Sequence, residues 1–172
     1  MSDSATPARP GRATRIGVTG HRVIPAAAYR HVHAGLTAVL RPRGSAGPVE
    51  AFSSLATGAD QLFAAIALDS GADLTVVTPA ADYETTFGPA ERDCFRHLLA
   101  RARRHIALDY ERVSGEAYFA AGAYIADRCD LMVAVWDGLP ARGHGGTAEI
   151  VDYTRALGKP VSVIWKTGVA RD

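Results

Sequence analysis

The sequence predicts a single doubly wound α/β domain with a mainly parallel sheet. Three observations lead to this fold class. The chain has 172 residues and is 48% hydrophobic, which fits one domain with a core of its own. Short apolar segments of β type alternate with longer segments of helical period, a pattern typical of parallel strands linked by helices. No internal repeat interrupts the alternation.

Six segments have the composition of strands. They are residues 15–19, 50–55, 74–78, 105–108, 131–136 and 161–165. The fifth segment is apolar at every position, which predicts a strand covered on both faces. Five segments of helical period separate the strands. The predicted helices begin near Pro25, Thr57, Pro89, Glu116 and Thr147.

Local signals support these helix boundaries. Proline suits the first turn of a helix. Thr57, with Asp60 three residues later, resembles a capping box, and Gly71 is a plausible stop for the same helix. In the first helix, Tyr29 and Val32 fall at the spacing of a buried face. Residues 80–88 have no clear period and are predicted to form a surface loop.

Composition narrows the classes of function. The formal net charge of +1 argues against a strongly basic nucleic-acid binder. Cys94 and Cys129 are the two cysteines of the chain, without metal-ligand spacing, and isolated thiols favour a reducing, cytoplasmic setting. No apolar run reaches the length of a membrane span. Residues 1–14 have no apolar signal region and are predicted to form a flexible tail ahead of a domain at residues 15–172. No metal or cofactor is expected.

Three predicted strand ends carry small polar residues that lead into helices. Ligands of open α/β sheets bind outside the carboxyl ends of the strands, so these residues are the candidate site. They are Thr19, Gly20, His21 and Arg22; Thr57, Gly58, Ala59 and Asp60; and Asp137, Gly138, Arg142, Gly143, Gly145, Gly146 and Thr147.

The glycine-rich third segment gives the strongest signal. Glycines let the backbone approach a ligand closely, and the start of the following helix offers unpaired N–H groups to a phosphate. Thr147 adds a hydroxyl donor, and Arg142 can pair with phosphate oxygens. The alternative is a flexible connection in which Thr147 only caps the helix. Neither a P-loop nor the G-x-G-x-x-G fingerprint is present, which argues against a nicotinamide-dependent dehydrogenase.

Other candidates also have two interpretations. His21 and Arg22 either contact a ligand or face solvent. The N–H of Gly58 either faces a ligand or belongs to an ordinary cap. Asp137 either accepts from a ribose or braces the glycine loop. Glu149 is either a general acid/base or a first-turn carboxylate placed for the helix dipole.

Four segments together resemble the SLOG superfamily, which includes the DprA and Lonely Guy (LOG) proteins. They read RIGVTGHR from Arg15, SLATGADQLFA from Ser54, DLMVAVWDG from Asp130, and ARGHGGTAEIVDYTRALGKPV from Ala141. The resemblance implies a Rossmann-like domain that binds nucleotides or nucleotide-derived molecules at the ends of the first, second and fifth strands. LOG-type members hydrolyse nucleoside 5′-monophosphates, DprA-like members bind single-stranded DNA, and other members are sensors.

The match to the LOG motif P-G-G-x-G-T-x-x-E is partial. Glu149 stands two residues after Thr147 instead of three, which turns a helical side chain by about 100°. Tyr124 and Asp127 occupy the region where the catalytic arginine of LOG proteins would fall. We therefore expect binding of a nucleotide or nucleoside phosphate, as by a sensor, in a homodimer. The alternatives are a phosphoribohydrolase with Glu149 as its catalytic residue and, with less support, a single-stranded DNA binder.

Overall fold

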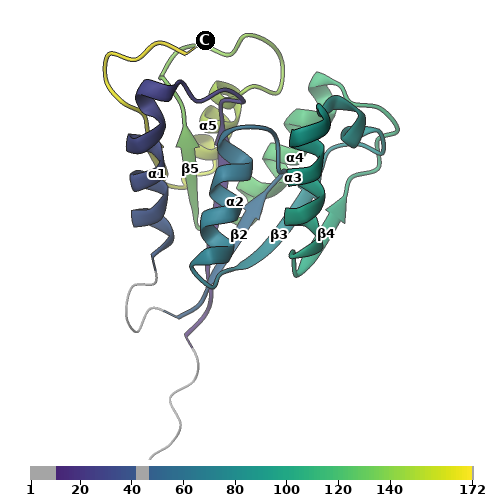
Figure 1. Cartoon of the computed structure of the whole chain (residues 1–172), viewed down its shortest axis with the longest axis horizontal. Helices are drawn as coiled ribbons and strands as arrows, with labels where there is room; N and C mark the ends of the chain where they lie inside the picture. Colours follow the sequence, from purple (N-terminus) through teal and green to yellow (C-terminus); the bar gives the residue numbers. More distant parts are fainter. Residues whose placement is uncertain (1–10, 42–46, 172) are drawn as a thin grey trace, which may run out of the picture.

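The computed structural model describes residues 11–41 and 47–171. In these residues the chain alternates strictly between strands and helices (Figure 1). The strands are β1 (Thr14–Gly20), β2 (Val49–Ser53), β3 (Asp73–Thr78), β4 (Arg104–Ala107), β5 (Leu131–Val135) and β6 (Val161–Ile164). The helices are α1 (Ala26–Leu40), α2 (Ala59–Asp69), α3 (Pro89–Ala100), α4 (Gly115–Arg128) and α5 (Thr147–Ala156), with a 3₁₀ helix η2 (Tyr83–Thr86).

The sheet has six strands within the described residues, in the order β4-β3-β2-β1-β5-β6. Every neighbouring pair is parallel, which confirms the predicted doubly wound α/β class. The chain starts at β1, moves outward to β4, and then returns through α4 to β5 on the other side of β1. The strand order therefore reverses next to β1, so the ends of β1 and β5 lie side by side.

Helices cover both faces of the sheet (Figure 1). One core cluster lies under α1, α2 and α3 and includes Val32, Leu36 and Phe63. A second lies under α4 and α5 and includes Ile125 and Ile150. β5 lies inside the sheet, and its last four residues are buried, as its apolar sequence predicted. None of the described helices has the length and apolarity needed to span a membrane.

Several predicted boundaries need correction. The segment 80–88 is not merely a surface loop, because it contains η2, and both Tyr83 and Phe87 are buried. α2 begins at Ala59 instead of Thr57, and its N-cap is Gly58 without a side-chain cap bond. Tyr29, which was expected on the buried face of the first helix, is 46% exposed. Of the predicted tail, residues 1–10 lie outside the described residues, while Thr14 already belongs to β1.

α4 has a side-chain cap that can be tested. The hydroxyl of Ser114 accepts a hydrogen bond from the N–H of Ala117 at 3.1 Å. We expect Ser114→Ala to lower the free energy of unfolding by about 1 kcal/mol, because the N–H would lose this partner. Ser114→Asp keeps an acceptor at the cap and is the matched control. Urea unfolding measures both, and equal losses in the two variants would contradict a capping role.

Candidate functional site

A cleft of about 560 Å³ opens at the carboxyl end of β1, where the strand order reverses, and is also lined by segments that follow β2, β3 and β5. Open α/β sheets bind their ligands at such points. The predicted site residues in its lining are Thr19, Gly20, His21, Arg22, Asp60, Arg142, Gly143, Gly145, Gly146 and Thr147. The predicted residues outside its lining are Thr57, Gly58, Ala59, Asp137, Gly138 and Glu149.

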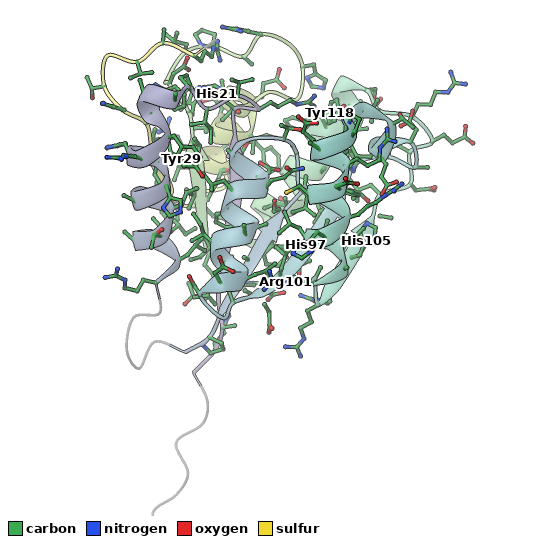
Figure 2. The ribbon with its side chains drawn as sticks, in the orientation of Figure 1. His21, Tyr29, His97, Arg101, His105 and Tyr118 are labelled. Carbon is green, nitrogen blue, oxygen red and sulfur yellow. The ribbon has the colours of Figure 1, made fainter. Side chains whose placement is uncertain are left out.

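The turn after β1 forms one wall of the cleft. The N–H of His21 donates to the carbonyl of Val135 at 3.0 Å, so the hydrogen bonding between β1 and β5 continues past the end of β1. Arg22 follows, and its guanidinium carbon lies 5.0 Å from the ring centre of Tyr118, which is a cation–π contact. Figure 2 shows His21 and Tyr118 at the same end of the molecule, away from His97 on α3 and from Arg101 directly after it.

His21 and Asp137 join the two strand ends. The peptide N–H of Asp137 donates to His21 Nε2 at 3.1 Å, and Asp137 Oδ1 lies 3.2 Å from the same nitrogen. The edge of His21 also meets Trp165, with ring centres 5.2 Å apart. Burial lowers the pKa of His21, against the opposing effect of Asp137. The neutral ring can accept the peptide N–H, and it holds the start of the glycine loop against β1.

Asp137 braces the loop, which was one of its two predicted roles. Its Oδ1 accepts the N–H of Leu139 at 3.0 Å, and its Oδ2 lies 3.2 Å from Arg171 Nε. The side chain is 4% exposed. With its oxygens directed to these groups, Asp137 shapes the loop instead of lining the cleft.

The glycine loop forms the opposite wall and ends at the start of α5. Gly145 has a φ of +82°, and a Cβ there would lie 2.7 Å from the carbonyl oxygen of Gly115 and 2.8 Å from Tyr118 Cβ. Glycine is therefore required for the loop to lie against α4. Gly146 is the N-cap and Thr147 the first helical residue, without a side-chain cap bond. Thr147 thus does not act as the cap, and the first N–H groups of α5 have no partner within the helix.

Glu149 also holds the loop. Its Oε2 accepts the N–H of Gly145 at 2.9 Å and lies 2.9 Å from His144 Nδ1. The ring of His144 stacks on Phe119, with centres 5.5 Å apart. The carboxylate is thus directed back at the residues before α5, an arrangement that stabilises a helix start.

The start of α2 supports the β1 turn from below. The N–H of Ala59 donates to the carbonyl of His21 at 3.1 Å. Gly58 has a φ of +86°, and a Cβ there would lie 2.3 Å from the carbonyl oxygen of Arg22. Gly58 and Ala59 therefore contact the backbone behind the cleft, and within the segment 57–60 only Asp60 reaches the lining.

Sequence reasoning missed Tyr83 and Arg171 as cleft residues. Tyr83 is 3% exposed and lines the cleft from η2. Its ring meets Phe87 and Phe95 edge-on, with centres 5.0 and 5.8 Å away. A signal was present in the sequence, because two aromatic residues four positions apart are unusual in a polar surface loop. Arg171 lies beyond the last strand, where the sequence has neither a helical nor a strand period from which its position could be predicted.

Asp60 has an unusual electrostatic environment. Burial raises its pKa to about 7, against the effects of the N–H groups of Ala56 and Ser54 and of the charge on Arg22. Burial also raises the pKa of Tyr83, and the charge of Asp60 adds to that effect. The cleft therefore contains a carboxyl group that changes its charge near neutral pH.

The raised pKa predicts how stability depends on pH. Between its unfolded value of 3.8 and its folded value of about 7, the folded protein binds a proton that the unfolded chain releases. The contribution of Asp60 to the free energy of unfolding therefore falls as the pH rises through this range. Asp60→Asn has no titrating carboxyl group at this position. The stability of the variant relative to the parent should therefore increase from pH 4.5 to pH 8. Urea unfolding at both pH values measures it, and a constant difference would contradict the assignment.

Across the described residues, no group of three or more histidine, cysteine, aspartate or glutamate side chains is arranged to hold a metal ion. Arg22, Arg142 and Arg171 all line the cleft, as do the glycines that precede α5. These groups suit an anionic ligand.

No protein-family model matches the chain, and no curated relative matches it either. Solved structures do. DNA processing protein A (DprA) from Streptococcus pneumoniae is similar with a TM-score of 0.63 and 15% identity, over 88% of this chain and 50% of that one. DprA from Helicobacter pylori, described by its single-stranded DNA binding mode, is similar with a TM-score of 0.62 and 13% identity. The match covers 87% of this chain and 64% of that one.

A third similar structure is the molybdenum cofactor carrier protein from Chlamydomonas reinhardtii. Its TM-score is 0.54 and its identity 17%, over 88% of this chain and 76% of the carrier protein. By contrast, the chain spans only 50% and 64% of the length of the two DprA chains. At these identities the likeness concerns the fold alone, and it confirms the Rossmann-like fold that the resemblance of the four sequence segments implied.

Proposed function

We propose that the protein binds a nucleotide or nucleoside phosphate in the cleft at the carboxyl end of β1, between the β1 turn and the glycine loop that follows β5. The observation that carries this proposal is the convergence of the β1 turn and the glycine loop on one cleft of about 560 Å³. A volume in this range suits a small ligand. The two walls come from segments more than a hundred residues apart in the chain, and each has a sequence typical of a ligand-binding strand end.

The phosphate would be held at the start of α5. The N–H groups of its first turn and the positive end of its dipole favour an anion. Thr147 adds a hydroxyl, and Arg142 brings a positive charge to the same wall. Arg22, stacked on Tyr118, would contact a further polar part of the ligand. Binding in this arrangement needs no catalytic step, as expected of a sensor.

A phosphoribohydrolase has less support. Glu149 is the candidate catalytic residue, but its carboxylate contacts Gly145 and His144 and lies outside the cleft lining. Arg128 is the arginine of α4 near the place where the LOG arginine would fall. It lies over the ring of Tyr124 at 3.4 Å, and neither residue lines the cleft. The two groups that hydrolysis would require are therefore not brought together at the proposed phosphate position.

Single-stranded DNA binding is favoured by one observation, the similarity to two DprA structures. The basic residues around β4 give it little support. Arg103 pairs with Asp73 at 2.6 Å, and Arg104 pairs with Glu50. These acidic partners neutralise part of the positive charge that would have to contact the phosphates of DNA.

Calorimetric titration tests the proposal. The panel consists of AMP, GMP, CMP, UMP, cyclic dinucleotides and a single-stranded oligonucleotide, each added to the full chain. We expect at least one nucleotide to bind with 1:1 stoichiometry. Release of free base, followed by chromatography, would support hydrolysis, and strong salt-dependent binding of the oligonucleotide alone would support a DprA-like function. Light scattering during size-exclusion chromatography tests the predicted homodimer.

A further inference from the structure

Asp60 is the one carboxylate in the cleft lining among the residues that the structure describes. The residue is 7% exposed and lies in the first turn of α2, with Arg22 and Tyr83 beside it in the lining. Arginines predominate among the other charged groups of the cleft. An ionised carboxylate in this position opposes the binding of a phosphate, because two anions in one cleft repel each other.

The groups that act on Asp60 come from every side of it. The N–H groups of Ser54 and Ala56 approach its carboxyl group from the loop before α2, and Arg22 acts from the β1 turn. Asp60 in turn helps to raise the pKa of Tyr83 on η2, and Tyr118 on α4 contacts Arg22. The remaining titratable or charged residues of the lining are His21, Arg142, His144 and Arg171.

A phosphate at the start of α5 would share this cleft with the Asp60 carboxylate. Low exposure leaves little water to screen the two charges from each other. Repulsion disappears when the carboxylate takes up a proton from solvent, and the neutral acid can then donate a hydrogen bond to a hydroxyl or base group of the ligand. Protonation thus turns an unfavourable contact into a favourable one.

We propose that Asp60 couples binding of a nucleoside phosphate in the cleft to the uptake of a proton, so that the ligand is held against a neutral carboxylic acid. This inference rests on the proposed function of the cleft. In the free protein, burial already raises the pKa of Asp60 to about 7, so a small further rise on binding keeps the carboxyl group protonated at neutral pH. The affinity should therefore decrease as the pH rises above neutrality.

Calorimetry of the wild-type chain and Asp60→Asn tests this coupling. AMP, GMP, CMP and UMP are titrated in HEPES and in Tris, whose different ionisation enthalpies reveal proton uptake. At pH 7.5 the wild type should take up more protons than Asp60→Asn. Between pH 7 and pH 9 its affinity should fall by up to about tenfold per pH unit, while the affinity of Asp60→Asn stays level. The phosphate of the ligand also ionises, near pH 6, and this contribution is the same in both proteins.

The outcomes separate the two proposals. Equal proton uptake and equal pH slopes in the two proteins would overturn the role of Asp60 and leave nucleotide binding standing. Absence of binding to the folded wild type at every pH would overturn both. If Asp60→Asn does not fold, NMR of the wild type gives the answer through the amides of Ser54 and Ala56. The pH midpoint of their chemical-shift change, which reports the ionisation of Asp60, should rise by a pH unit or more with bound nucleotide. An unchanged midpoint would overturn the coupling.

Discussion

Gly58→Ala is expected to lower the free energy of unfolding by at least about 3 kcal/mol, through backbone strain and steric overlap together. Gly58 is the N-cap of α2, with a φ of +86° and a ψ of −119°, a region open to glycine and costly for other residues. A Cβ there would also lie 2.3 Å from the carbonyl oxygen of Arg22. The β1 turn would have to move, so ligand binding should weaken as well.

Gly71→Ala is the matched control for this variant. Gly71 follows α2 and has a φ of +83°, but a Cβ there would meet nothing within 4 Å. Its substitution should cost only the backbone strain, about 1–2 kcal/mol. Urea unfolding of both variants separates strain from overlap. Equal losses would show that the close approach of Gly58 to the β1 turn contributes nothing to stability.

Gly143→Asp should weaken nucleotide binding by at least about a hundredfold, because like charges brought together cost several kcal/mol. Gly143 lines the cleft beside the start of α5. A Cβ at this position meets nothing within 4 Å, and φ lies outside the left-handed region. The added carboxylate should therefore enter the phosphate position without disturbing the fold. Calorimetry measures the change in affinity, and thermal unfolding checks stability.

Gly143→Asn separates charge from volume. Its side chain has nearly the same shape as that of aspartate but is uncharged, so we expect a loss of less than about tenfold. A similar loss in both variants would show that the ligand is excluded by size. No loss in either would place the anion elsewhere.

Strand ends and helix starts could be predicted from the sequence because local chemistry determines them. Apolar runs predicted six strands, and all six are present in the described residues. The turn after β1 and the glycine loop were each recognisable from a few consecutive residues. Parallel topology then brings their ends together. This is why ten of the predicted site residues line one cleft, although no local pattern relates the segments to each other.

Residues that depend on tertiary contacts were not predictable in this way. Tyr83 lies on a single turn of 3₁₀ helix, too short to give a period, and is buried by aromatic rings from α3 and α4. Arg171 pairs with Asp137 across 34 positions. Tyr29 was misplaced because the buried row of α1 runs through Ala28 at four-residue spacing, so the small alanine occupies the buried position that the larger side chain was expected to fill.

The most direct test of the central claim is an NMR titration that locates the ligand. Amide resonances of the full chain are followed while the best-binding nucleotide of the calorimetric panel is added. We expect the largest shifts at residues 20–22 and 143–147, which form the two walls of the cleft, and small shifts along α3 and β4. Shifts centred on α3 and β4, or none at either wall, would contradict a nucleotide site between the β1 turn and the glycine loop.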